Sequence, residues 1–183
     1  MQVLESTVNP QSDDFRANAE VMEAHIATFR DVEQKVLDLA EAAREKFIKR
    51  GKLLPRDRIN RLLDRGTPFL ELCSLAGYKM HDDKDGSLSG GGIIAGIGTV
   101  SGVRCLVVAS NSAIKGGTIT PAGLDKTLRL QQIAMENKLP GVSLSESGGA
   151  NLNYAAEVFV DGARTFANQA RLSCLLYTSD AAD

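Results

Sequence analysis

The first apolar pattern in the chain has helical spacing. Between residues 13 and 50, apolar side chains recur at steps of three and four and so share one helix face: Val32, Val36, Leu39, Ala43 and Phe47. Gly51 ends this pattern, and a second, shorter helix is predicted for residues 56–65 after Pro55. Residues 1–15 are rich in Ser, Asn, Asp and Gln, so we expect a disordered arm there. Residues 16–66 are therefore predicted to form an N-terminal helical segment.

Beyond Gly66 the pattern changes to that of an α/β domain. Two apolar runs, residues 93–100 and 103–109, predict strands, and the Ser101-Gly102 pair between them predicts a hairpin turn. The second run is apolar at successive positions, which indicates a strand covered on both faces.

A helix, a strand and a final helix are predicted downstream. The helix spans residues 122–138, with Leu124, Leu128 and Met135 as its apolar stripe. A short strand follows at residues 142–144, and another helix runs from about residue 150 to 172. The succession of strand, helix and strand predicts a right-handed parallel unit.

Composition and charge narrow the class of protein. The chain has 183 residues, 43% of them hydrophobic and 24% charged, which is typical of a globular domain. A net charge of −2 argues against nucleic acid as the main partner. The acidic, polar start and the lack of a long apolar run predict a cytoplasmic protein without a membrane anchor. Cys73 and Cys105 lack metal-ligand spacing, so we expect reduced thiols and no metal.

One segment is strongly basic. Residues 44–65 contain nine basic and three acidic residues, a local charge of +6. A solvated helix face is the favoured explanation of this run, and a cationic rim for phosphate groups is the alternative.

The stretch Ser145-Glu146-Ser147-Gly148-Gly149-Ala150-Asn151-Leu152 stands between a predicted strand and a predicted helix. Two glycines at such a turn let backbone N–H groups approach a ligand oxygen, with the positive end of the helix dipole behind them. A developing enolate or tetrahedral oxyanion gains most from such preorganised donors.

Several motifs in fixed order resemble one family. These are Gly51-Lys52-Leu53-Leu54-Pro55-Arg56-Asp57-Arg58-Ile59, Pro68-Phe69-Leu70-Glu71-Leu72, Lys115-Gly116-Gly117-Thr118, Glu136-Asn137-Lys138-Leu139-Pro140 and the glycine turn. Over about residues 30 to 173 the chain is similar to the carboxyltransferase (beta) subunit of biotin-dependent acyl-CoA carboxylases. The resemblance implies an α/β fold of the crotonase-like type, a superhelix of strand and helix units, with an N-terminal helical extension.

The resemblance also implies a division of the chain. Residues 67–173 correspond to an incomplete N-terminal carboxyltransferase domain on the acyl-CoA side, and the second domain of the family's subunit is absent. Residues 174–183 resemble a translated sequencing adapter, and we expect them to be an artefact. A genuine C-terminal strand and tail is the alternative.

In this family, the resemblance implies, carboxybiotin releases carbon dioxide and the biotin anion removes the substrate proton. Gly148 and Gly149 would then donate N–H groups to the thioester enolate, with Ala150 at the helix start behind them. Lys115, Gly116, Gly117 and Thr118 would shape the acyl-CoA pocket. Biotin would arrive on a separate alpha subunit, which alone uses ATP and bicarbonate, because this chain lacks an Ala-Met-Lys-Met motif. Other beta subunits are the remaining expected partners, and the fragment by itself is expected to be inactive.

One difference from the family pattern bears on which acyl-CoA is the substrate. After Leu152 the chain continues Asn153-Tyr154-Ala155-Ala156, where the methylcrotonoyl-CoA branch usually has Pro. This difference favours geranyl-CoA and a role in terpene degradation, with methylcrotonoyl-CoA and propionyl-CoA carboxylases as alternatives.

Three other interpretations stay open. Ser147 sits in a sequence like a nucleophile elbow, but His25 and His81 both lie upstream of it, where a hydrolase of that type needs a downstream His. Gly90-Gly91-Gly92 resembles a dinucleotide fingerprint but precedes a predicted strand and opens no helix. A non-catalytic module that binds acyl-CoA is the third.

Overall fold

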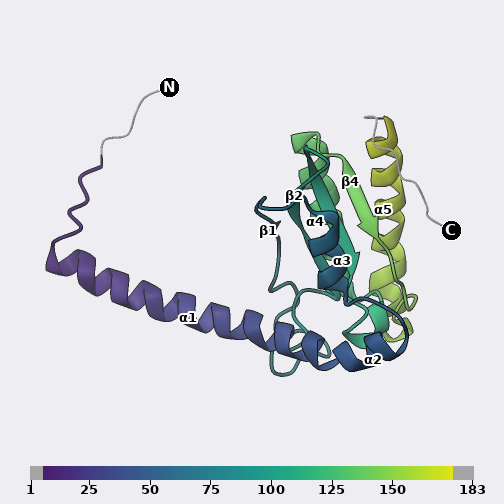
Figure 1. The fold of residues 1–183 in the computed structure, drawn as a ribbon, viewed down its shortest axis with the longest axis horizontal. Coiled ribbons are helices and arrows are strands. Elements are labelled where there is room, and N and C mark those ends of the chain that lie inside the picture. The colour runs from purple at the N-terminus through teal and green to yellow at the C-terminus, as the bar shows by residue number, and fades with distance from the viewer. Residues whose placement is uncertain (1–5, 175–183) are drawn as a thin grey trace.

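A long N-terminal helix projects away from the sheet domain (Figure 1). The structure is a computed structural model that describes residues 6–174, so five residues of the expected N-terminal arm and most of the expected adapter segment lie outside it. Helix α1 (Asp13–Ala42) begins where Ser12 caps it, because the Ser12 side chain accepts a hydrogen bond from the Phe15 N–H at 3.2 Å.

The prediction of one continuous helix to residue 50 is wrong. The chain turns at Ala43, and a separate helix α2 (Arg44–Lys49) follows. Val32 and Phe47 from the predicted apolar stripe are buried, whereas Leu39 is 38% exposed. The change of direction lets Phe47 reach the body of the protein, although Leu39 remains at the surface.

A mixed sheet of four strands forms the centre of the α/β part. The strands are β1 (Leu70–Glu71), β2 (Ile93–Val100), β3 (Val103–Ser110) and β4 (Gly141–Leu144), in that spatial order. β1 with β2 and β2 with β3 are antiparallel, while β3 with β4 is parallel. The predicted hairpin and the predicted parallel unit are both confirmed.

The hairpin turn shows why its two residues were informative. Ser101 and Gly102 both have positive φ, 50° and 79°, as a tight turn between twisted strands requires. The carboxylate of Asp64 accepts both turn N–H groups, from Ser101 at 2.8 Å and from Gly102 at 2.7 Å. These bonds connect the turn to the segment that follows the third helix.

Helices cover both faces of the sheet. Helix α3 (Pro55–Leu62) contributes Ile59 to a cluster with alternate residues of β2 and β3, namely Ile94, Cys105, Val107 and Ala109. On the other face, α4 (Pro121–Asn137) and α5 (Ala155–Cys174) pack with Ala95 and Leu106 through Leu130, Ala134 and Leu172 (Figure 1). Successive residues of β3 therefore point into two different cores, which confirms the prediction made from its unbroken apolar run.

Helix α4 connects the two parallel strands. Thr120 caps it by accepting the Gly123 N–H at 3.1 Å, Pro121 occupies its first turn, and Lys138 ends it in the left-handed conformation. None of the helices within residues 6–174 is long and apolar enough to cross a membrane.

Candidate functional site

The glycine turn follows β4 but does not open a helix. Residues 145–151 form an irregular segment, a short 3-10 turn occupies Leu152–Tyr154, and α5 begins only at Ala155. The expected helix start at Ala150 is therefore wrong. Ala150 instead pairs with Ile119 in a parallel bridge, and this non-local pairing holds the segment extended. The helix dipole consequently does not stand directly behind Gly148 and Gly149.

The structure brings the two predicted site segments together. Lys115–Gly117 forms a short 3-10 turn after β3, and it packs along the glycine turn. The Gly148 N–H donates to the Gly117 carbonyl at 3.2 Å, and the Ile119 N–H donates to the Gly149 carbonyl at 2.9 Å. A Cβ at Gly117 would lie 2.2 Å from the Glu146 carbonyl oxygen, so only glycine allows this approach.

The two candidate donors differ in how they are engaged. The Gly148 N–H is held by a backbone carbonyl, whereas the Gly149 N–H donates to Ser147 Oγ at 3.0 Å. A Ser hydroxyl moves by rotation about one bond, so the Gly149 N–H is the more easily released of the two. Gly149 has a φ of 86°, and a Cβ there would meet nothing within 4 Å, so the turn is open on this side.

Glu146 links the glycine turn to the basic segment. Its carboxylate accepts a hydrogen bond from Lys52 Nζ at 2.5 Å and from Ser112 Oγ at 2.8 Å, and Arg58 lies 3.8 Å away. The hydrogen bond from Lys52, followed by that from Ser112, lowers the pKa of Glu146. The ionised carboxylate thus orders two cations of the +6 segment beside the turn.

A largely apolar cavity of about 520 Å³ lies between the sheet and α5. Its lining includes Gly117, Thr118 and Ala150 from the predicted site and Ser147, which was considered as a nucleophile. Helix α5 contributes Val158, Phe159 and Phe166 to the opposite wall, and Phe159 and Phe166 are 60% and 71% exposed. Lys115, Gly116, Gly148 and Gly149 are not among its lining residues, although they belong to the two segments that border it.

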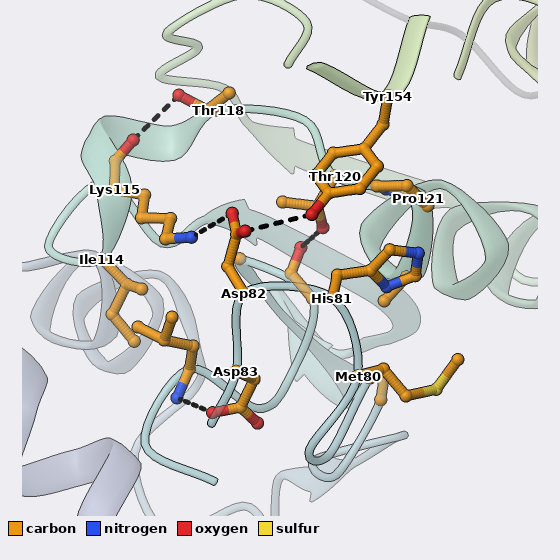
Figure 2. A pocket seen from close by; sticks show the side chains of 16 residues that line it. Met80, His81, Asp82, Asp83, Ile114, Lys115, Thr118, Thr120, Pro121 and Tyr154 are labelled. Atoms are coloured by element: carbon orange, nitrogen blue, oxygen red, sulfur yellow. Dashed lines mark hydrogen bonds and ion pairs between the residues drawn. The ribbon is translucent and has the colours of Figure 1, made fainter. Parts of the chain in front are cut away.

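Lys115 points into a second, smaller pocket, which Figure 2 shows. Its Nζ donates to Asp82 Oδ2 at 2.6 Å, and the Tyr154 hydroxyl donates to Asp82 Oδ1 at 3.0 Å. The hydrogen bond from Lys115, then that from Tyr154, lowers the pKa of Asp82. The ring of His81 meets the Tyr154 ring edge-on, with centroids 4.9 Å apart. Asp82 therefore contacts both Lys115, a predicted pocket residue, and Tyr154, which belongs to the run after Leu152 that departs from the methylcrotonoyl-CoA pattern.

Sequence reasoning missed Asp82, because residues 78–89 form a polar loop with no periodic pattern.

A metal centre receives no support within residues 6–174, where no three His, Cys, Asp or Glu side chains gather to hold an ion. Ser147 Oγ has only the Gly149 N–H as a hydrogen-bond partner in the described chain, while His81 contacts Glu157 at 3.2 Å. Within residues 6–174, Ser147 therefore forms no hydrogen bond with a histidine, as the serine of a Ser-His hydrolase does.

Comparison with known proteins identifies the family. The family described as "Carboxyl transferase domain" matches residues 46–178. The chain belongs to this family. The match continues past Ser173, where the adapter-like sequence begins, into residues outside the described structure.

Individual relatives agree with this family assignment. The chain is 45% identical over 175 residues to a probable mitochondrial methylcrotonoyl-CoA carboxylase beta chain of Drosophila melanogaster, covering 93% of this chain and 30% of the relative. A 3-methylcrotonyl-coenzyme A carboxylase beta1 subunit of Mycobacterium tuberculosis is 49% identical over 136 residues, covering 73% and 25%. The chain thus spans about a third or less of the length of these relatives.

Solved structures support the same family. The beta subunit of P. aeruginosa geranyl-CoA carboxylase matches with 67% identity and a TM-score of 0.84, covering 94% of this chain and 32% of that one. A transcarboxylase 12S structure matches at 21% identity with a TM-score of 0.73, covering 83% and 30%, and so shows the fold alone. These neighbours confirm the crotonase-like α/β fold that the resemblance implied.

Proposed function

We propose that the chain forms the acyl-CoA side of a beta-type carboxyltransferase subunit, with geranyl-CoA as its substrate. The observation that carries this proposal is the packing of the Lys115–Gly117 turn against the glycine turn at the edge of an apolar cavity of about 520 Å³. The 67% identity to a geranyl-CoA carboxylase beta subunit supports the choice of acyl group.

The cavity suits the apolar part of such a substrate. A long isoprenoid chain would lie against Phe159 and Phe166, whose rings line one wall. The thioester would then lie near the glycine turn, and the phosphates of coenzyme A would lie toward Lys52 and Arg58, which face Glu146 next to the turn. In this arrangement each end of the substrate meets side chains of matching chemistry.

The chain's own contribution to the chemistry is to stabilise negative charge on the thioester oxygen. The Gly149 N–H is the better donor, since rotation of the Ser147 side chain about its Cα–Cβ bond moves Oγ away without a change in the backbone. The Gly148 N–H already supports the turn through the Gly117 carbonyl. A positioned backbone donor of this kind is worth on the order of 10²-fold to 10³-fold in rate.

A biotin group carried by a separate alpha subunit would supply the carboxyl group. One feature of the described residues fits such a group: the glycine turn is open beside Gly149, and this leaves space for a reacting group there. Other beta subunits are the remaining partners that we propose.

The proposal is tested in the complete beta subunit that carries this segment, mixed with its biotinylated alpha subunit. We expect a higher kcat/KM for geranyl-CoA than for methylcrotonoyl-CoA. Phe159→Ala should narrow that preference, because Phe159 lines the cavity, whereas the matched change Phe29→Ala on the projecting helix α1 should not. A preference for methylcrotonoyl-CoA would reassign the substrate, and coenzyme A binding without turnover would reduce the role to a binding module.

A further inference from the structure

Lys126 is a buried lysine in α4. Its exposed fraction is only 3%, and it forms no ion pair within residues 6–174. Its Nζ donates instead to two backbone carbonyls, that of Ile93 at 2.7 Å and that of Gly90 at 3.2 Å. Lysine is seldom fully buried without a charged partner, so this placement calls for a physical reason.

The two carbonyls belong to the first and last residues of the loop Gly90–Ile93, which contains three consecutive glycines. Gly90, Gly91 and Gly92 have φ values of 95°, 65° and 71°, and residues other than glycine rarely adopt this backbone conformation. A Cβ at Gly91 would lie 2.8 Å from the Gly123 Cα, so the loop touches the start of α4 backbone to backbone.

Every carbonyl of this loop is held. Thr120 Oγ1 donates to the Gly91 carbonyl at 3.4 Å, and the Asn111 N–H donates to the Gly92 carbonyl at 2.9 Å. Lys126 holds the other two, at the start and end of the loop. Because glycines have large conformational freedom, these four contacts, together with the bond from the Gly90 N–H to the Ala76 carbonyl at 2.9 Å, restrict the loop to one conformation.

The loop borders both cavities of the site. Gly91 and Gly92 line the apolar cavity beside α5 and also the smaller pocket that contains Lys115. A shift of the loop would therefore change the shape of both spaces at once.

Burial of the ammonium group has a cost. Desolvation, the largest effect, lowers the pKa of Lys126 to about 8, while Glu71 and Cys73 act to raise it and Arg56 to lower it. An apolar side chain would avoid this cost but would remove the Lys126 donor from the Ile93 carbonyl and leave the Gly90 carbonyl with the Ile93 N–H, at 3.2 Å. The amine therefore supplies hydrogen bonds that packing alone cannot replace.

We propose that Lys126 is a positioning residue for the acyl-CoA site, which acts by fixing the Gly90–Ile93 loop as the shared wall of the two cavities. The effect on the loop stands independently, and the effect on catalysis rests on the function proposed above.

Amide hydrogen exchange tests the effect on the loop in the 183-residue chain. Lys126→Met should raise the exchange rate of the Ile93 N–H, which donates to the Gly90 carbonyl, by about tenfold or more. Amides at the centres of β2 and β3 should keep their protection. Arg129→Met, an exposed change on the same helix, is the matched control and should alter neither. Unchanged exchange at Ile93 in the Lys126 variant would overturn the proposal.

A second measurement decides the matter if Lys126→Met does not fold. In the unaltered chain, the carbonyl ¹³C shifts of Gly90 and Ile93 should titrate together near pH 8, and in a Cys73→Ser background they should still titrate together, with a midpoint that is the same or slightly lower. The cysteine variant is needed because Cys73 is among the groups acting on Lys126, besides Glu71 and Arg56. Titration that disappears with Cys73, or no titration near pH 8, counts against the proposal.

Turnover of the complete beta subunit tests the link to the site. Lys126→Met should lower kcat/KM for the acyl-CoA on the order of 10²-fold, as small misplacements of a substrate do, and Lys126→Arg should recover part of it. Unchanged turnover with increased loop exchange would refute the positioning role. A complete subunit without any carboxyltransferase activity would instead refute the proposed function, and the exchange result would still decide the role of Lys126 in the loop.

Discussion

The hydroxyl of Tyr154 donates a hydrogen bond to Oδ1 of Asp82 at 3.0 Å, across a separation of 72 residues. The other oxygen of the same carboxylate accepts a hydrogen bond from Lys115. One side chain in a loop thus connects the turn after β3 to the start of α5 (Figure 2).

Asp82→Ala should disconnect these two elements. Because all three side chains are partly exposed, the melting temperature should change little, but KM for the acyl-CoA should rise by about two- to fivefold. Asp85→Ala in the same loop is the control, since the bond that Asp85 accepts from the Ser87 N–H is local. The lowered pKa of Asp82 keeps its bonds intact at neutral pH, and they should weaken only when acid protonates it. Steady-state kinetics with equal KM values for both variants would contradict the connection.

Lys126 should give the chain an unusual dependence of stability on alkaline pH. Its folded pKa is lowered to about 8 from an ordinary 10.5, so between these values the unfolded state binds more protons. The free energy of unfolding should therefore rise with pH across this window, on the order of 3 kcal/mol from this residue. Urea unfolding at pH 7 and pH 10 measures the change, and the difference between the original chain and Lys126→Met isolates it from other titrating groups. An equal pH dependence in both proteins would exclude this origin.

Two neighbouring glycines offer a matched test of the contact between the Lys115–Gly117 turn and the glycine turn. Gly116 and Gly117 have similar φ values, 64° and 75°, so alanine causes similar backbone strain at each, roughly 1–2 kcal/mol. Only at Gly117 would the new Cβ collide with a backbone atom, the Glu146 carbonyl oxygen, whereas at Gly116 it meets nothing within 4 Å. Gly117→Ala should therefore destabilise the chain by a further ~1–3 kcal/mol and weaken acyl-CoA binding. Equal losses of stability and affinity in the two variants would show that the approach of the two turns is unimportant.

Ser147→Ala separates a carboxyltransferase from a hydrolase. Since Ser147 Oγ accepts the Gly149 N–H, its removal frees this donor, and carboxyl transfer should stay within a few-fold of the original rate or rise. A nucleophilic serine would instead lose on the order of 10⁶-fold in kcat. Labelling by a fluorophosphonate probe at Ser147 in the unaltered subunit provides an independent check, and stoichiometric labelling would favour the hydrolase.

Local sequence patterns predicted the elements whose conformation depends on their own residues. The Ser101-Gly102 turn and the doubly covered strand β3 were predictable, because turn chemistry and an unbroken apolar run determine them. The start of α5 was not, since residues 150–154 are compatible with a helix but Ala150 pairs with Ile119, about thirty residues upstream. Non-local pairing overrides helix propensity there.

In the candidate site, too, local motifs were predictable and contacts between distant segments were not. Its two glycine segments were found from motifs, but their contact was visible only in the structure. Lys126 reads as an ordinary surface lysine, because its burial depends on the carbonyls of Gly90 and Ile93, more than thirty residues upstream. Asp82 gave no signal, since its partners Lys115 and Tyr154 are distant in the chain.

The hydrogen bonds between Asp64 and the hairpin turn have a consequence for folding while the chain is being synthesised. β1, β2 and β3 lie within residues 70–110, whereas β4 pairs with β3 only after the whole of α4 has been added. A hairpin closes in about 1–10 μs, while a ribosome adds roughly 5–20 residues each second. The antiparallel part of the sheet, with its turn bound to Asp64, therefore has time to form during synthesis, and the emerging β4 meets an edge that already exists.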